Sequence, residues 1–284
     1  MPLIIFSHAN SFPASTYRVL FRSLRSRGFT VKAIDKLGHD PAYPVTDNWP
    51  HLAKQVAAFA AAEIEKAGEA AFLVGHSLGG FLSLMAAARQ PQMGGHGVAG
   101  VLLLDSPLVG GWRSTALQVG KLTPMMEKMS PAGVSKTRRT HWPSREAALL
   151  AFQAKKAFAR WEPRVLKDYI EHGIDIDIDI DIDGDGVKCV LGFNREIETA
   201  IYNTVPHNLE SLLRRHPLQC PVAFIGGTHS REMKQAGMAM TERIAQGRVT
   251  MMQGGHLFPM ERPLEAAAAI GAAIQSLPQR LPGR

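Results

Sequence analysis

Short apolar segments alternate with longer helix-like segments through the first hundred residues, and the alternation returns near the end of the chain. We expect buried strands at 3–6, 29–34, 71–74, 98–104, 222–225 and 248–252. Helical periodicity covers about 16–27, 49–66, 78–89 and 264–276. Apolar strands joined by amphipathic helices are typical of a parallel sheet with helices on both faces. The pattern predicts the α/β class, with a mostly parallel sheet of about six strands.

The alternation stops between residues 107 and 216, where helix-like segments follow one another. We therefore predict a core domain of residues 1–106 and 217–284 and an inserted helical cap of residues 107–216. Inside the cap, Ile and Asp alternate over 174–183, which places all the Ile side chains on one face of an extended strand. The Asp and Gly residues at 183–186 predict a turn, so we expect a hairpin near 174–193.

A calcium loop is the alternative for this repeat. Asp179, Asp181, Asp183 and Gly184 match the opening of an EF-hand loop, but the twelfth position is Val190 where a bidentate Glu is needed. No helical pattern leads into the run. We favour the hairpin and expect no metal.

Composition fits a globular protein with a full core, because 45% of its 284 residues are hydrophobic and 20% are charged. The net charge is +7, but the Lys and Arg residues are scattered and the densest group, Lys136–Arg139, is short. We expect no nucleic-acid partner. The two cysteines, Cys189 and Cys220, have neither disulfide nor metal spacing, and we expect no cofactor.

The chain's apolar runs are too short for a signal sequence or for a membrane-spanning helix. We therefore expect a cytoplasmic protein.

The clearest chemical motif is Gly75-His76-Ser77-Leu78-Gly79, which lies between a predicted strand and a predicted helix. This is the setting of a nucleophilic serine on a sharp turn, where glycines remove collisions with neighbouring backbone. The turn also places Ser77 at a helix N-terminus, so that the amide of Leu78 can face a developing oxyanion. We expect Ser77 to be a nucleophile.

A serine hydroxyl needs a base in contact with it. His256 follows the last predicted strand and precedes the last helix, so its loop leaves the sheet at the same carboxyl edge as Ser77. We expect His256 to be that base. His76, beside the nucleophile, is held by the turn and is expected to pack rather than react.

These features together resemble the α/β-hydrolase superfamily, in particular the branch of small esterases with a helical cap. The resemblance rests on the Ser77 turn, a His8 turn after the first strand, the segment 35–39 and the His256 motif, and it covers residues 1–106 and 217–277. It implies that the amide of Asn10 completes the oxyanion hole with Leu78. The family pattern begins with two antiparallel strands before Leu3, so we expect a fold that lacks these first two strands.

The acid of a catalytic triad has two candidate positions. The loop after the penultimate strand, where the family usually has an Asp, contains Ser230 and Glu232 instead. The other family position holds Asp105, at the end of a strand that neighbours the Ser77 strand. A neutral hydroxyl stabilises imidazolium much less than a carboxylate does. We favour Asp105, with Glu232 or Ser230 in reserve, although a purely structural Asp105 is an alternative.

The sequence thus predicts a serine hydrolase, close to the carboxylesterases, that cleaves an ester or related acyl bond of a small substrate. Cleavage of thioesters or carbon–carbon bonds and acyl transfer use the same residues. Aromatic residues in the cap favour a hydrophobic substrate, but core packing explains them equally well: Trp112, Trp142, Phe152, Phe158 and Trp161. The absence of the usual Asp leaves one alternative, a small-ligand binding protein with slow or no turnover. The oligomeric state is not indicated.

Overall fold

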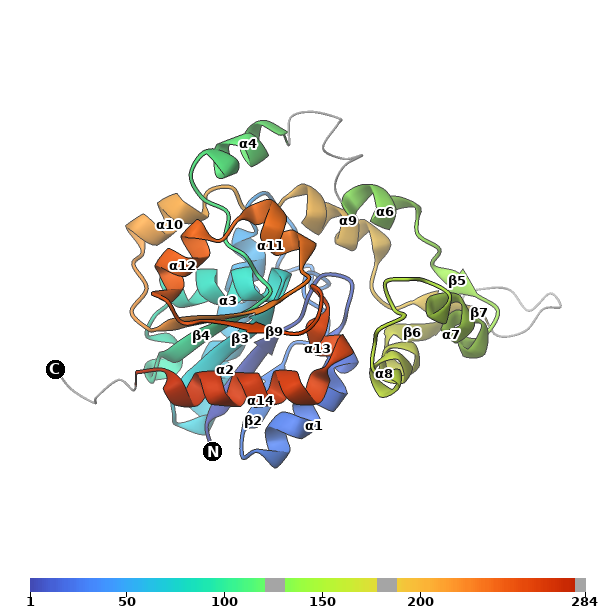
Figure 1. The fold of residues 1–284 in the computed structure, drawn as a ribbon, viewed down its shortest axis with the longest axis horizontal. Helices are drawn as coiled ribbons and strands as arrows, with labels where there is room; N and C mark the ends of the chain where they lie inside the picture. The colour runs from blue at the N-terminus through green and yellow to red at the C-terminus, as the bar shows by residue number, and fades with distance from the viewer. Residues whose placement is uncertain (121–130, 178–187, 279–284) are drawn as a thin grey trace.

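The main sheet confirms the predicted α/β class. A computed structural model describes residues 1–120, 131–177 and 188–278, and in these residues the sheet has six strands, all parallel, in the order β2-β1-β3-β4-β8-β9 (Figure 1). The strands are β1 (Leu3–Ser7), β2 (Thr30–Ala33), β3 (Ala71–His76), β4 (Val98–Leu104), β8 (Val222–Gly227) and β9 (Val249–Met252). Each predicted strand is therefore present, within a few residues.

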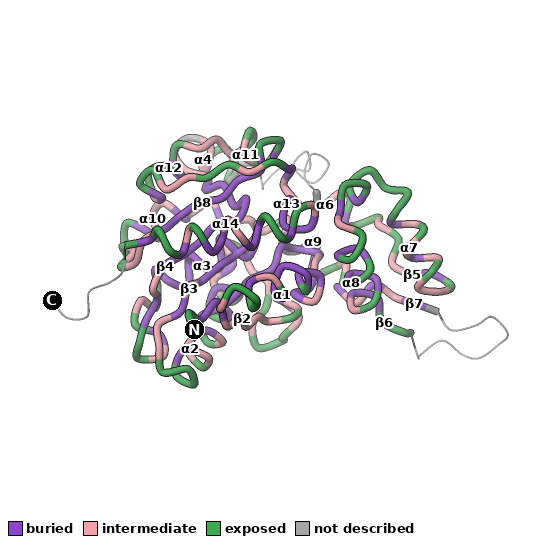
Figure 2. Tube along the Cα trace, turned by 60° about the horizontal axis from the view of Figure 1, so that its bottom comes forward, coloured by how far each residue is buried: buried purple, intermediate pink, exposed green. Residues whose placement is uncertain are grey.

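Helices cover both faces of this sheet. One face carries α2 (Pro50–Ala67), α3 (Leu78–Arg89), α10 (Leu209–Arg215) and α12 (Ala239–Ala245), and the other carries α1 (Arg18–Ser26) and α14 (Pro263–Ser276). Alternate strand residues enter the two cores: Ile5 packs with the first set of helices, and Ile4 and Phe6 with the second. Figure 2 shows the buried strands between helices whose outer sides are exposed. A parallel sheet needs this double cover because its strands are apolar on both faces.

A second group of elements lies beside the main sheet, between β4 and β8 in the chain (Figure 1). Its described elements are α4 (Trp112–Gly120), α6 (Pro131–Thr137), β5 (His141–Trp142), α7 (Arg145–Gln153), α8 (Pro163–Gly173), β6 (Ile174–Asp177), β7 (Lys188–Leu191) and α9 (Arg195–Asn203). Strands β5, β7 and β6 form a small antiparallel sheet. The Ile-Asp repeat thus begins in β6, opposite β7, whereas the calcium-type residues Asp179, Asp181, Asp183 and Gly184 lie outside the described residues.

Most of the aromatic residues predicted in this region pack against one another. The rings of Phe152, Phe158 and Trp161 meet Tyr169 of α8 with centroids 5.3 to 6.1 Å apart, and Trp142 meets Phe152. All of them are buried. This burial supports the packing explanation for the four residues. The side chain of Trp112 lies outside the described part of the chain.

Four short helices lie in the remaining connections of the part of the chain that the structure describes: η1 (Ala14–Tyr17), η2 (Met93–Gly95), α11 (Arg231–Ala236) and α13 (Phe258–Glu261). Helix α8 packs against η1, which anchors the second group to the main sheet. Across residues 1–120, 131–177 and 188–278, every helix is too short or too polar to cross a membrane.

The turn from β3 into α3 has room only for glycine two residues before and two residues after Ser77. A Cβ atom on Gly75 would collide with the backbone of Gly79 and Gly80, and a Cβ on Gly79 would collide with the carbonyl groups of Ser7 and His8. The contact at Gly79 holds the start of α3 against the loop that follows β1. The turn therefore brings the β1 loop and Ser77 together at one edge of the sheet.

We expect Gly79→Ala to lower the free energy of unfolding by about 1–3 kcal/mol or more, because the neighbouring backbone must move. Gly271→Ala is the matched control: it lies in α14, and its added methyl would be 3.4 Å from the ring of Phe29, an ordinary contact. That change should be neutral or stabilise by up to about 1 kcal/mol. Urea denaturation measures both, and equal stabilities of the two variants would contradict the packing described for Gly79.

Candidate active site

Ser77 occupies the turn between β3 and α3 in a strained conformation. Its φ and ψ angles are 53° and −116°, in a region that residues other than glycine rarely adopt. The Ser77 N–H donates to the carbonyl of Leu104 at 3.0 Å, which ties the turn to neighbouring strand β4. Strained residues persist only where their surroundings hold them, and they cluster at functional sites. The hydroxyl of Ser77 is thus presented at the carboxyl edge of the sheet.

His256 reaches Ser77 from the loop between β9 and α13. Its Nε2 atom lies 3.0 Å from Ser77 Oγ, and its Nδ1 atom lies 2.8 Å from Asp105 Oδ1. An ionised carboxylate can only accept a hydrogen bond, so Nδ1 carries the proton and donates to Asp105. Nε2 is then free to accept the hydroxyl proton of Ser77. The imidazole is held in the tautomer that a general base requires.

Asp105 lies directly after β4 and is fully buried. Its φ angle of 42° is a second strained position at this edge of the sheet. Oδ2 accepts the N–H of Gly227 at 2.7 Å, and Oδ1 accepts the hydroxyl of Ser230 at 2.6 Å as well as the His256 proton. Three donors therefore fix the carboxylate in place. The structure puts Ser230, a reserve candidate for the partner of His256, against Asp105, one contact away from the imidazole.

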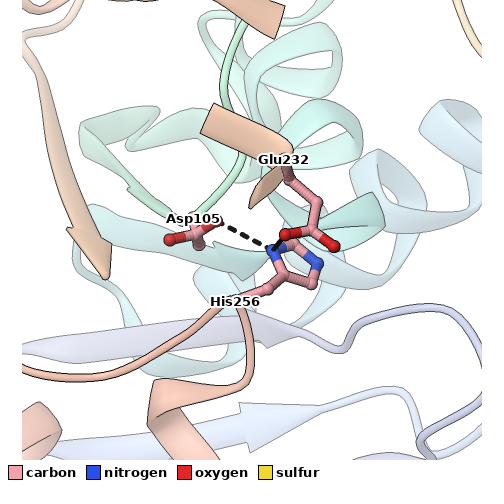
Figure 3. A group of neighbouring side chains, drawn as sticks. All are labelled: Asp105, Glu232 and His256. Carbon is pink, nitrogen blue, oxygen red and sulfur yellow. Dashed lines mark hydrogen bonds and ion pairs between the residues drawn. The ribbon is translucent and has the colours of Figure 1, made fainter. Parts of the chain in front are cut away.

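Glu232, the reserve acid, lies farther from His256. Its Oε2 atom is 3.8 Å from Nδ1, and its side chain is 46% exposed, whereas that of Asp105 is fully buried. Figure 3 shows both carboxylates beside the same ring nitrogen, Asp105 from the end of β4 and Glu232 from the start of α11. Only Asp105 is within hydrogen-bond distance. The geometry therefore favours Asp105 as the partner of the ring.

The two carboxylates determine the direction in which the pKa of His256 is shifted. Burial acts to lower the pKa of His256, but the hydrogen bond to Asp105 and the negative charges of Glu232 and Asp105 outweigh it. The pKa of His256 is therefore raised above its ordinary value of 6.5.

The predicted oxyanion residues lie on two adjoining backbone segments. Leu78 begins α3, where the first N–H groups of a helix have no acceptor within the helix. Asn10 lies in the loop after β1, whose Ser7 is in register with Gly75 of β3. Asn10 Nδ2 donates to the carbonyl of Glu198 at 3.0 Å, so its side chain points to α9. Both amides therefore belong to segments that meet at the Ser77 turn.

His8 holds the start of the β1 loop. Its Nδ1 donates to the carbonyl of Ala9 at 2.7 Å, and its Nε2 accepts the N–H of Leu37 at 2.8 Å. Burial lowers the pKa of His8 to about 4, so the ring is neutral at physiological pH and serves as a structural bridge.

A chain of buried hydrogen bonds joins this loop to His256. The N–H of Ala9 donates to the Tyr17 hydroxyl at 3.1 Å, which donates to His76 Nδ1 at 2.7 Å. His76 Nε2 then donates to the carbonyl of His256 at 2.9 Å. Burial, followed by the charge of His256, lowers the pKa of His76 to about 3, so this ring remains neutral. His76 thus packs and supports its neighbours, as predicted.

The structure brings together Ser77, His256 and Asp105, which the sequence places far apart. Two buried residues with polar groups lie near them and were not predicted from the sequence, Tyr17 and Glu198. A signal for Glu198 was available, because it lies three positions before the buried Ile201 and hence on the inward side of a helix. Tyr17 carries no such signal, since a buried tyrosine is ordinary in a core.

The chain belongs to the alpha/beta hydrolase family, because a model of that family matches residues 4–270. A comparison with curated protein sequences found no match.

Solved structures share the fold at low sequence identity. An E-2-(acetamidomethylene)succinate hydrolase is 22% identical, with a TM-score of 0.69 over 97% of this chain and 92% of that one. The peroxisomal α/β-hydrolase Lpx1 of Saccharomyces cerevisiae is 13% identical, with a TM-score of 0.66 over 99% and 80%. Epoxide hydrolase A of Mycobacterium thermoresistibile is 16% identical, with a TM-score of 0.62 over 98% and 92%. At these identities the likeness concerns the fold alone.

The raised pKa of His256 can be measured directly. We expect its imidazole to titrate with a midpoint above 6.5 in ¹H–¹⁵N NMR spectra, while the rings of His8 and His76 stay neutral between pH 5 and 8. Glu232→Gln removes one negative charge beside the ring and should lower the midpoint. Loss of the signal in His256→Gln assigns it. A midpoint below 6.5, or one that Glu232→Gln leaves unchanged, would contradict this electrostatic description.

Proposed function

We propose that the protein is a serine hydrolase, close to the carboxylesterases, that cleaves an ester or related acyl bond of a small substrate through an acyl-enzyme. One observation carries the proposal: His256 lies 3.0 Å from Ser77 Oγ through Nε2 and 2.8 Å from Asp105 through Nδ1. This is the arrangement in which a base activates a serine and an acid orients the base.

The reaction follows from these contacts. Ser77 Oγ attacks the substrate carbonyl carbon while its proton passes to His256 Nε2, and Asp105 stabilises the imidazolium that results. The carbonyl electron pair moves to the oxygen, which the amides of Leu78 and Asn10 stabilise. Collapse of this intermediate expels the alcohol, which takes the proton from His256. Water then repeats the sequence on the acyl-enzyme and regenerates Ser77.

A serine at the nucleophile position argues against dehalogenase or epoxide hydrolase chemistry, which in this family uses an Asp nucleophile. We expect a hydrophobic acyl or aromatic group in the substrate. The buried aromatic residues between β4 and β8 already pack with one another. Support for a hydrophobic group in the substrate therefore rests on the apolar character of that part of the chain.

The alternative of a non-catalytic binding protein arose from the absence of an Asp after β8. Asp105, hydrogen-bonded to His256 from the neighbouring strand β4, removes that reason. The tests below separate the two functions.

We expect a fluorophosphonate probe to label the protein rapidly at Ser77, because the hydroxyl is activated by His256. Mass spectrometry locates the label, and Ser77→Ala should abolish it. Ser83→Ala is a matched control: Ser83 lies in α3 and is buried, and its variant should be labelled like the wild type. A wild-type Ser77 that stays unlabelled would favour the binding protein.

We expect Asp105→Asn to lower kcat for a short p-nitrophenyl ester by roughly a thousandfold or more, because Asn cannot hold the required tautomer or stabilise the imidazolium. Glu232→Gln should stay within about tenfold of the wild type, since Glu232 is 3.8 Å from the ring and half-exposed. The reverse order of the two losses would make Glu232 the acid. Steady-state kinetics with a series of acyl chain lengths would also define the preferred substrate.

A further inference from the structure

The loop that follows β1 is held by a helix from outside the main sheet. We define residues 8–11 as the oxyanion loop. Asn10 Nδ2 donates to the main-chain carbonyl of Glu198 at 3.0 Å, and Ser11 Oγ donates to the Glu198 carboxylate at 2.5 Å. Glu198 belongs to α9, in the region between β4 and β8. Two polar contacts therefore tie the oxyanion loop to this region.

Glu198 is itself fixed by a buried ion pair. Its Oε2 atom lies 2.7 Å from Arg138, just after α6, and both side chains are largely buried, with exposed fractions of 5% and 13%. Oε1 is the atom that accepts from Ser11, so each carboxylate oxygen has its own partner. A buried ion pair adds little net stability, because desolvation of the charges offsets their attraction. Its clearest effect here is to hold the carboxylate in one orientation.

The loop needs this support because its own backbone is strained. Ser11 has a φ of 76°, in the left-handed region that favours glycine. Such a conformation is unfavourable and persists only where surrounding contacts hold it. Next to it, Asn10 is held at both ends of its side-chain amide, since Oδ1 accepts the N–H of Ser11 at 3.1 Å. The contacts to α9 thus hold Asn10, the residue whose amide would face an oxyanion, and its neighbour Ser11.

We propose that Glu198, oriented by Arg138, is a positioning residue that sets the oxyanion loop through Ser11 and so aims the amide of Asn10. This proposal rests on the proposed function, and it gives the region between β4 and β8 a part in positioning the oxyanion loop. An oxyanion-hole donor acts only when it is aimed at the charge of the transition state, so a small displacement lowers the rate without affecting substrate binding equally.

An aryl trifluoromethyl ketone tests the proposal because its adduct carries an oxyanion. Ser77 Oγ adds to the ketone carbon, the carbonyl electron pair moves to oxygen, and the serine proton passes to His256. Ser11→Ala leaves the Arg138–Glu198 pair intact, and Glu198→Gln keeps the side-chain volume. Each should raise the inhibition constant and lower kcat by roughly tenfold, with KM within about twofold, which corresponds to about 1.4 kcal/mol. The double variant should lose little more than the worse single variant, because both act through one contact.

Asp168→Asn is the matched control. Asp168 of α8 pairs with Arg22 of α1 at 3.4 Å and is also mostly buried, so this change removes the charge from another polar contact between the same two regions, one that includes no residue of the oxyanion loop. Its inhibition constant should stay within about twofold of the wild type. If Asp168→Asn raises the inhibition constant as much as Ser11→Ala does, then any weakening of the contacts between the two regions explains the effect and the proposal is wrong.

Hydrogen exchange keeps the proposal testable if Ser77 proves inert. The N–H groups of Ser11 and Phe12 have acceptors within the loop, at 3.1 and 3.2 Å, so a loosened loop should exchange them faster. We expect faster exchange in the peptide 7–13 of Ser11→Ala and Glu198→Gln than in Asp168→Asn. Unchanged exchange would overturn the proposal, and so would faster exchange with unchanged inhibition in an active enzyme. An inert wild-type Ser77 would instead overturn the proposed function.

Discussion

The turn between β3 and α3 is the constraint on which the rest of the site depends. At Gly75 and Gly79 there is no space for a Cβ atom, and α3 therefore starts directly against the carbonyl groups of the β1 loop. Ser77, between these glycines, has a positive φ angle. Parallel strands all end at the same edge, which brings Asp105 and the His256 loop to the same place. Non-glycine residues with positive φ follow three adjacent strands here: Ser11, Ser77 and Asp105. Backbone strain is thus concentrated where chemistry is expected.

Three buried or half-buried histidines near this edge have pKa values that are shifted in different directions for clear physical reasons. Burial dominates at His8 and His76 and lowers the pKa of each ring, and at His76 the charge of His256 lowers the pKa further. His256 faces two carboxylates, and their effect exceeds that of burial and raises its pKa. The neutral rings serve as fixed hydrogen-bond bridges, and the third can exchange a proton. The Tyr17–His76 chain places one of these bridges behind His256 itself.

The region between β4 and β8 combines apolar packing with a few buried polar contacts. Its aromatic cluster around Tyr169 packs against Phe12, next to the oxyanion loop, and the Arg138–Glu198 pair reaches the loop itself through Ser11. Both kinds of contact thus join the region to the segment that follows β1. The boundaries of a core of 1–106 and 217–284 and a cap of 107–216 stay a prediction.

Strand period, helix period and glycine spacing are local patterns, so they are enough to predict a mostly parallel sheet of about six strands and the turn at Ser77. It also indicated that His256 leaves the sheet at the same edge. Which carboxylate meets the imidazole depends on how the whole chain packs: Asp105 is 151 residues from His256 along the chain, and Glu232 is nearer in sequence but farther in space. The contact between Ser11 and Glu198, which are 187 residues apart, could not be predicted from local sequence patterns for the same reason. Hydrogen-bond partners are selected by distances of a fraction of an ångström, which arise only when the whole chain has packed.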